Sequence, residues 1–110
     1  MKEKIFENKI KSELKKRGAY VIKYWGGGRF TKSGVPDILT CYKGKFLGLE
    51  IKAENGKPSE LQKYNIELIR KAQGIGLILY PKDYDKFINL LNRIDEEVEN
   101  ANILFKDWML

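Results

Sequence analysis

Two acidic residues, Asp37 and Glu50, lie on either side of a Lys43-Gly44 dipeptide in a stretch rich in apolar residues. Such a dipeptide between two apolar segments is typical of the turn of a β-hairpin. With a two-residue turn or a four-residue loop, the antiparallel ladder makes Asp37 the direct cross-strand partner of Glu50. A three-residue loop would shift the register by one and separate the carboxylates. The sequence therefore predicts an acidic pair that depends on the turn.

The strand that follows this turn adds a lysine to the pair. Side chains alternate between the two faces of a strand, so Glu50 and Lys52 share one face. Leu47, Leu49 and Ile51 point to the other face, where we expect a helix to cover them. Two opposed carboxylates, with Cβ atoms about 4.5 to 5.5 Å apart, repel each other. We therefore expect a cation beside them.

A divalent metal and an ammonium group together suit the hydrolysis of phosphodiesters. Mg²⁺ binds carboxylate oxygens and keeps several waters, so Asp37 and Glu50 would make an open metal site. The metal would acidify a water molecule, and Lys52 would help to stabilise the added negative charge or orient that water. Taken singly, Asp37 simply starts a strand after a proline, and Glu50 and Lys52 form an exposed charge pair. Their joint placement favours the metal site.

The composition narrows the chemistry further. The 110 residues include no histidine, which excludes catalytic triads, HExxH zinc hydrolases and nucleases with a histidine base. Cys41 is the only cysteine, so an internal disulfide is excluded. The net charge is +6, and residues 1–35 carry ten basic and three acidic side chains; nucleic acid is the usual partner of such a basic region, and a merely solvated surface explains the charge equally well. No apolar run is long enough to span a membrane, so we expect a soluble, cytoplasmic protein.

The apolar pattern predicts an α/β (α+β) fold in one domain, residues 1–110, with a mixed central sheet flanked by helices in the order α-β-β-β-α-β-α. The first helix carries an apolar stripe of Phe6, Ile10 and Leu14, and the second begins after Ser59. Leu61, Tyr64, Leu68 and Ala72 form the predicted apolar stripe of that second helix. The expected segments are a helix over 3–17, strands over 20–25, 37–42 and 45–52, a helix over 59–73, a strand over 75–80 and a helix over 84–98.

Pro36-Asp37 followed by Glu50-Ile51-Lys52 resembles the motif of the PD-(D/E)xK nuclease superfamily. The surrounding segments 34–37 and 56–59 resemble the VRR-Nuc (virus-type replication-repair nuclease) branch, whose small phage members stand alone. The resemblance covers roughly residues 5–80. It implies a restriction-endonuclease-like core and a DNA endonuclease that needs Mg²⁺ or Mn²⁺. It also suggests a homodimer that cuts branched DNA such as a four-way (Holliday) junction during replication or repair.

The same resemblance maps two further site residues onto the helices. A family acid on the first helix corresponds to Glu7, as an additional metal ligand, although Glu3 and Glu13 compete for that role. A family glutamine on the second helix corresponds to Gln62. Both residues also have a purely structural explanation. Glu7 could stabilise the N-terminal end of its helix by its negative charge. Gln62 stands three residues after Ser59, which is the spacing of a capping box.

A glycine-rich segment, residues 26–36, is expected to form a loop with exposed basic side chains. We expect Arg29 and Lys32 to contact DNA phosphates, together with Lys23 and Lys57. Trp25 or Phe30 is expected to stack on an unpaired base. A glycine-rich surface hairpin is the alternative. The segment also has the spacing of a P-loop apart from Thr31, but the residues after it do not permit the long helix that a P-loop requires.

Three hypotheses follow from the sequence. The first is a metal-dependent DNA endonuclease with a site of Asp37, Glu50 and Lys52. The second is a non-catalytic DNA-binding module on the same fold, which would bind DNA without cutting it. The third is a nucleotide-binding protein that uses the glycine-rich loop. For a nuclease dimer, the apolar residues 103–110 are the predicted contact between copies.

Overall fold

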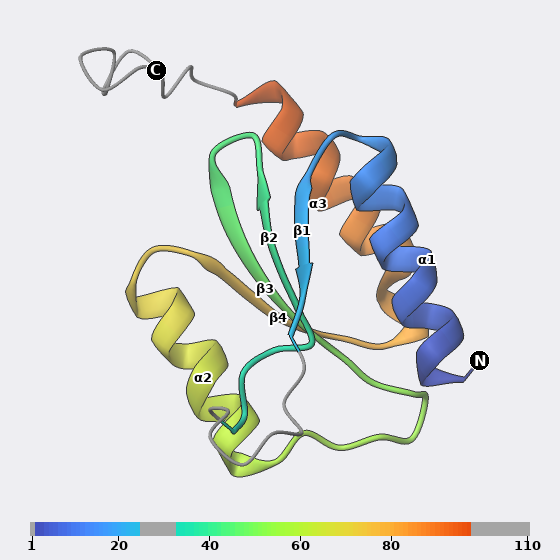
Figure 1. Cartoon of the computed structure of the whole chain (residues 1–110), viewed down its shortest axis with the longest axis vertical. Helices are drawn as coiled ribbons and strands as arrows, with labels where there is room; N and C mark the ends of the chain where they lie inside the picture. Colours follow the sequence, from blue (N-terminus) through green and yellow to red (C-terminus); the bar gives the residue numbers. More distant parts are fainter. Residues whose placement is uncertain (1, 25–32, 98–110) are drawn as a thin grey trace.

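The computed structural model describes residues 2–24 and 33–97. These residues form the predicted order of helices and strands, with one short 3₁₀ turn added before the last helix (Figure 1). The elements are α1 (Glu3–Lys16), β1 (Tyr20–Lys23), β2 (Ile38–Tyr42), β3 (Lys45–Ile51), α2 (Glu60–Lys71), β4 (Ile75–Leu79), η1 (Pro81–Asp83) and α3 (Tyr84–Glu96).

The four strands form one mixed sheet in the order β1-β2-β3-β4. The pairs β1–β2 and β2–β3 are antiparallel, whereas β3 and β4 are parallel and α2 connects them. Helices α1 and α3 lie on one side of the sheet and α2 lies on the other side (Figure 1). The predicted fold class, a mixed sheet flanked by helices, is therefore confirmed.

The turn between β2 and β3 has two residues. Lys43 and Gly44 both have positive φ, 49° and 84°, as a tight hairpin turn requires. Tyr42 pairs with Lys45, and the ladder continues to the pair of Ile38 with Leu49. One further step along this antiparallel register brings Asp37, which precedes Ile38, and Glu50, which follows Leu49, to the same end of the hairpin. These two residues are the predicted acidic pair.

The core fills the space between the sheet and the α1–α3 side. The alternation predicted for β3 is confirmed, since Leu47, Leu49 and Ile51 are fully buried there. Burial of such an aliphatic side chain stabilises the fold by about 1.5–3 kcal/mol. The other members of this core come from α1, the sheet and α3: Phe6, Ile10, Leu14, Ile38, Tyr42, Leu79, Phe87, Leu91 and Ile94.

The predicted apolar stripe of α2 is wrong as a guide to its buried face. Leu61, Tyr64 and Leu68 are exposed, whereas Asn65 and Ile66 are buried against the sheet. The reason is a close approach of α2 to β3, where Gly48 has no Cβ and the side chain of Ile69 takes that space. The face that packs on the sheet thus includes a polar residue, and the apolar face remains uncovered in the described part of the chain.

Some predictions fall on residues 25–32 and 98–110, which lie outside the described residues. They concern the end of the first strand at Trp25, the glycine-rich loop with Arg29 and Lys32, and the apolar C-terminal segment. Within the described ranges, none of the helices has both the length and the apolar character that crossing a bilayer would require.

Candidate active site

Asp37 is positioned by a turn that packs closely on α2. Gly34 has a φ of 80°, and a Cβ at this residue would lie 2.6 Å from the Leu61 side chain and 2.8 Å from the Asn65 amide nitrogen. Only glycine fits such a contact without displacing α2. Beyond the turn, Asp37 Oδ2 accepts a hydrogen bond of 3.0 Å from the backbone N–H of Ile51 on β3. The carboxylate is thus fixed at the open end of the hairpin.

Glu50 lies beside Asp37 and is buried, with 3% of its surface exposed. Burial, followed by the negative charge of Asp37 and their side-chain hydrogen bond, raises the pKa of Glu50 to about 8 against the opposing effect of Lys52. Lys52 Nζ lies 3.6 Å from Glu50 Oε2, and 14% of its side chain is exposed. The alternative of an exposed charge pair is therefore wrong for these two residues.

Gln62 connects this acidic pair to the start of α2. Its Oε1 accepts a hydrogen bond of 2.8 Å from the Ser59 N–H, while Ser59 Oγ accepts one of 3.1 Å from the Gln62 N–H. Its Nε2 donates to Glu50 Oε2 at 3.2 Å. The capping box and the contact with the acid, two explanations that the sequence left as alternatives, therefore occur together in one side chain.

A cavity of about 260 Å³ opens onto the acidic pair. Its lining joins the end of β1, the turn before β2, the end of β3 and the start of α2, through Tyr24, Ser33, Gly34, Val35, Asp37, Glu50 and Gln62. Substrate groups would reach both carboxylates through this cavity. Sequence reasoning assigned neither Tyr24 nor Ser33 to the site, because Tyr24 lies in no recognisable motif and Ser33 was placed only in the glycine-rich loop.

Glu7 lies on α1 and is also buried, with 3% of its surface exposed. Its Oε1 is 2.8 Å from Lys23 Nζ, and its Oε2 is 3.3 Å from both Lys4 Nζ and Lys11 Nζ. Burial alone would raise the pKa of Glu7, but hydrogen bonds from Lys23 and Lys11 outweigh it and lower the pKa. Lys23 Nζ also lies 3.7 Å from Asp37 Oδ1. Lys23 therefore stands between Glu7 and the acidic pair.

The three predicted acids do not form one metal-binding group. In residues 2–24 and 33–97, no cluster of three or more His, Cys, Asp or Glu side chains has the geometry to hold a metal ion. Asp37 and Glu50 nevertheless fit a divalent cation, because two adjacent carboxylates with a common cavity repel each other until a cation is present. Within the described residues, Lys23 connects Glu7 to this pair.

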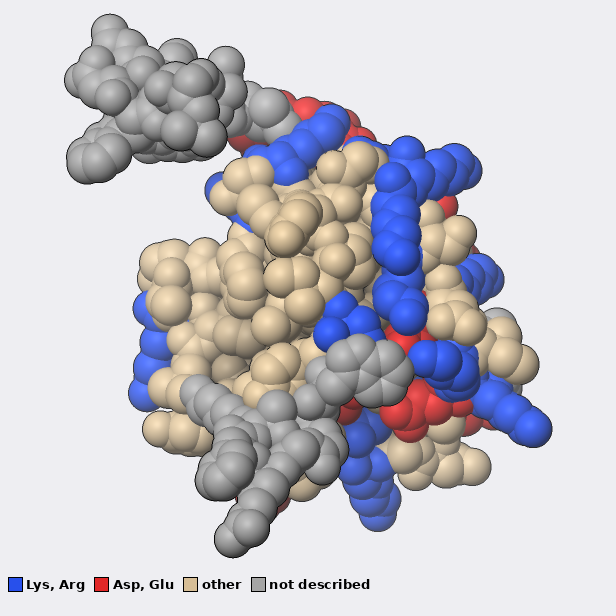
Figure 2. Space-filling view, viewed as in Figure 1, with Lys and Arg blue, Asp and Glu red and all other residues tan. Residues whose placement is uncertain are grey.

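The predicted DNA-binding lysines have two different surroundings. Lys57 is exposed in the segment between β3 and α2, whereas Lys23 is mostly buried in its ion pairs. Sequence reasoning missed Lys4 and Lys11 as partners of Glu7. Their spacing of three and four residues from Glu7 on a helix was the available signal. Basic side chains gather on the α1 side of the view in Figure 2.

Comparison with known proteins supports the interpretation of this geometry. Residues 1–102 match the family model of the archaeal Holliday junction resolvase (Hjc), which belongs to the PD-(D/E)xK superfamily. The match names this family and does not confirm the VRR-Nuc branch that the sequence resembled. No curated protein matches the chain. The family members are metal-dependent endonucleases with a role at DNA junctions. The chain belongs to the archaeal Holliday junction resolvase family and is a structure-selective, metal-dependent endonuclease.

Proposed function

We propose that Asp37 and Glu50 bind Mg²⁺ or Mn²⁺ and that Lys52 assists cleavage of the phosphodiester at the same site. The observation that carries this proposal is the burial of Glu50 against Asp37, which raises the pKa of Glu50 to about 8. A bound divalent ion would relieve the repulsion, polarise the phosphate and acidify the attacking water. Carboxylate oxygens bind either Mg²⁺ or Mn²⁺, so the proposed site accepts both ions.

The protein side chains then have separate roles. Lys52 Nζ lies 3.6 Å from Glu50 Oε2, and we propose that this ammonium group would stabilise the charge that develops on the phosphate oxygens of a bound substrate. Gln62 holds the Glu50 carboxylate in place and is itself fixed by Ser59. Asp37 is fixed by the Ile51 N–H, so the two acids are oriented before substrate binds. We propose that Glu7 contributes through Lys23, and that Arg29, Lys32 and Lys57 contact phosphates.

The experiment that tests this function is cleavage of a labelled four-way junction and of a linear duplex with the same sequence. We expect the wild type to cut the junction with Mg²⁺ or Mn²⁺, to cut the linear duplex much more slowly, and to be inactive in EDTA. Asp37→Asn should bind the junction without cutting it. Equal cutting in EDTA, or full activity of Asp37→Asn, would contradict the proposed site.

We also propose that the protein is a homodimer, with the contact on an uncovered apolar face. This face consists of Tyr20 and Ile22 on β1, Phe46 on β3, and Leu61, Tyr64 and Leu68 on α2, all exposed. Uncharged side chains fill the surface between the β2–β3 hairpin and α2 in Figure 2. Such a face, with Lys45 as the charged residue of its groove, is a surface on which two chains of net charge +6 repel each other little.

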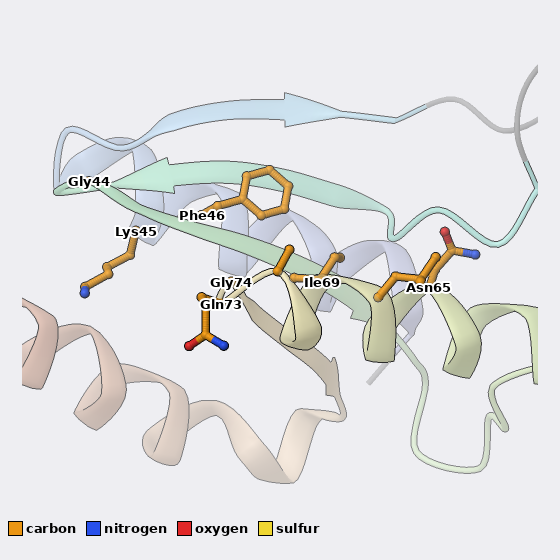
Figure 3. Close-up of a pocket in the computed structure, with 9 residues that line it drawn as sticks. Gly44, Lys45, Phe46, Asn65, Ile69, Gln73 and Gly74 are labelled. Atoms are coloured by element: carbon orange, nitrogen blue, oxygen red, sulfur yellow. The ribbon is translucent and has the colours of Figure 1, made fainter. Parts of the chain in front are cut away.

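A groove in this apolar face gives the second copy a place to dock. It has a volume of about 530 Å³ and runs between the start of β3 and α2, lined among others by Phe46, Leu68 and Ile69 (Figure 3). Exposed apolar patches of this kind mark interaction surfaces in soluble proteins. Two copies related by a two-fold axis would present two sites, as a junction with two strands to cut requires.

Sedimentation of wild type and variants tests the dimer. Phe46→Glu and Tyr64→Glu would each place a charge on the apolar face and should convert a dimer into a monomer. Asn89→Glu, which adds the same charge at an exposed position on α3, is the control and should remain dimeric. A wild-type monomer at high concentration would contradict the proposal.

The more specific assignments from the sequence remain proposals. The segment Gly34–Asp37 with Gln62 supports a VRR-Nuc-like, phage-type protein, and such a protein would act in the host cytoplasm. The whole chain, residues 1–110, would then be one nuclease domain. Activity measured on the chain as it stands tests this, because a stand-alone nuclease needs no further domain.

A further inference from the structure

The surroundings of Glu7 differ from those of the acidic pair in the number of cations. Three ammonium groups, those of Lys4, Lys11 and Lys23, lie within 3.3 Å of the two Glu7 carboxylate oxygens. Each oxygen thus already has a cationic partner. By contrast, among the described residues Glu50 has a single ion-pair partner, Lys52.

Lys23 is the residue that links these two regions. It pairs with Ile38 on β2, directly after Asp37, so its position is set by the sheet register. Its Nζ lies 2.8 Å from Glu7 Oε1 and 3.7 Å from Asp37 Oδ1. The other oxygen of Asp37, Oδ2, accepts the Ile51 N–H. The ammonium group therefore occupies the space between two carboxylates that belong to different elements.

We propose that the Lys23 ammonium stands in the place that a second divalent cation would need, between Glu7 and Asp37, so that each active site binds a single divalent ion. This inference rests on the proposed function, in which Asp37 and Glu50 hold that one ion. Glu7 is then a positioning residue for Lys23 and not a metal ligand. A fixed cation on the protein takes over part of the charge compensation that a second ion would supply.

Repulsion between like charges supports the assignment of a single divalent ion to each site. A second ion beside Glu7 would meet the three ammonium groups at distances where like charges repel strongly in a partly buried site. Displacement of Lys23 alone would leave two lysines on Glu7 but would open the space next to Asp37. Lys23 is therefore the residue whose removal should change the number of bound ions.

The test is the number of Mn²⁺ ions bound per chain without DNA, measured by titration with detection of free Mn²⁺ by electron paramagnetic resonance. We expect one ion for the wild type and two for Lys23→Met. The double variant with Lys23→Met and Glu7→Gln should return to one. Lys11→Met is the matched control, since among the described residues Lys11 contacts Glu7 and Lys23 is the lysine beside Asp37, and this variant should bind one ion.

The outcomes separate this inference from the proposed function. Two ions on the wild type would overturn the inference and leave the metal site intact. No ion on the wild type, or one ion that persists in Glu50→Gln, would overturn the proposed site itself. If Lys23→Met does not fold, as judged by circular dichroism, the wild-type stoichiometry decides alone. One ion on a folded Lys23→Met would also overturn the inference.

Discussion

The two ends of the β2–β3 hairpin both hold buried or half-buried carboxylates, but their electrostatic surroundings are opposite. At the open end, Glu50 faces the negative charge of Asp37, and its pKa is raised to about 8. At the turn end, Asp95 of α3 accepts a hydrogen bond from Tyr42 and lies 3.0 Å from Lys43 Nζ. The hydrogen bond from Tyr42 and the contact with Lys43 lower the pKa of Asp95.

The difference shows which end stabilises the fold and which end is built for a ligand. The turn end also includes Arg17, which lies 3.4 Å from Asp95 and 2.7 Å from Glu13, so α1 is joined to the C-terminal part of α3. Arg17, Glu13, Lys43 and Asp95 are thus all paired with opposite charges. At the open end, burial of two adjacent acids costs stability until a cation arrives, and such a cost is typical of functional sites.

Glu50→Gln should have the largest effect on activity. Loss of one carboxylate from the metal pair removes the charge that holds the cation, so the single-turnover rate of junction cleavage should fall by about 10³-fold. Tyr42→Phe, at the turn end, should keep the rate within about twofold, because its hydroxyl bonds to Asp95 far from the site. A similar loss of cleavage rate in Glu50→Gln and Tyr42→Phe would mean that the two ends of the hairpin do not differ in role.

Lys52→Ala should have the next largest effect. Removal of an ammonium group that faces the developing phosphate charge is expected to lower kcat by about 10²-fold, with a smaller change in the junction Kd. Lys86→Ala removes the same charge from an exposed position on α3 and is the control. A Kd that weakens as much as kcat falls would indicate that Lys52 only binds DNA.

Gln62→Ala and Ser59→Ala together separate the two roles of the glutamine. Both break the capping box, so each should lower the free energy of unfolding by about 1 kcal/mol. Only Gln62→Ala removes the hydrogen bond to Glu50, and it alone should slow cleavage, by roughly tenfold. Equal rates for the two variants would leave Gln62 with the capping role alone.

Tyr42→Phe should have the smallest effect, and it concerns stability. Loss of the hydrogen bond to Asp95 should lower the free energy of unfolding slightly at neutral pH. A lowered folded-state pKa gives stability that is present above the unfolded-state pKa of about 3.9 and is lost as the pH falls below it. Urea unfolding should therefore show the difference between wild type and variant shrinking in acid. A difference in unfolding free energy between wild type and Tyr42→Phe that grows in acid would contradict this pH dependence.

The register of the acidic pair could be predicted because it depends on local rules. A two-residue turn at Lys43-Gly44 and the alternation along β3 determine which residues face each other. The capping box at Ser59 is equally local, since its residues are three positions apart. These features need no knowledge of how the helices pack.

The buried face of α2 and the contact of Glu7 with Lys23 could not be predicted in this way. The apolar stripe of α2 was clear, but the side that packs on the sheet is decided by the space above Gly48. Glu7 and Lys23 are 16 positions apart in sequence and meet only because α1 packs beside β1. Such features depend on tertiary packing, which overrides the pattern within one helix.

Thermal unfolding of the wild type and Glu50→Gln at different pH values, in EDTA and in Mn²⁺, tests the central claim most directly. A raised folded-state pKa gives stability that is present below the unfolded-state pKa of about 4.3 and is lost as the pH rises towards about 8. In EDTA at pH 8, Glu50→Gln should therefore be more stable than the wild type by at least about 1 kcal/mol, or roughly 4–8 °C in Tm.

Mn²⁺ should raise the Tm of the wild type, more at pH 8 than at pH 6, because a carboxylate binds metal in its deprotonated form. It should have little effect on Glu50→Gln. A wild type that is more stable than Glu50→Gln in EDTA at pH 8, or an equal rise in Tm for both proteins with Mn²⁺, would contradict the claim that this acidic pair is held ready for a cation.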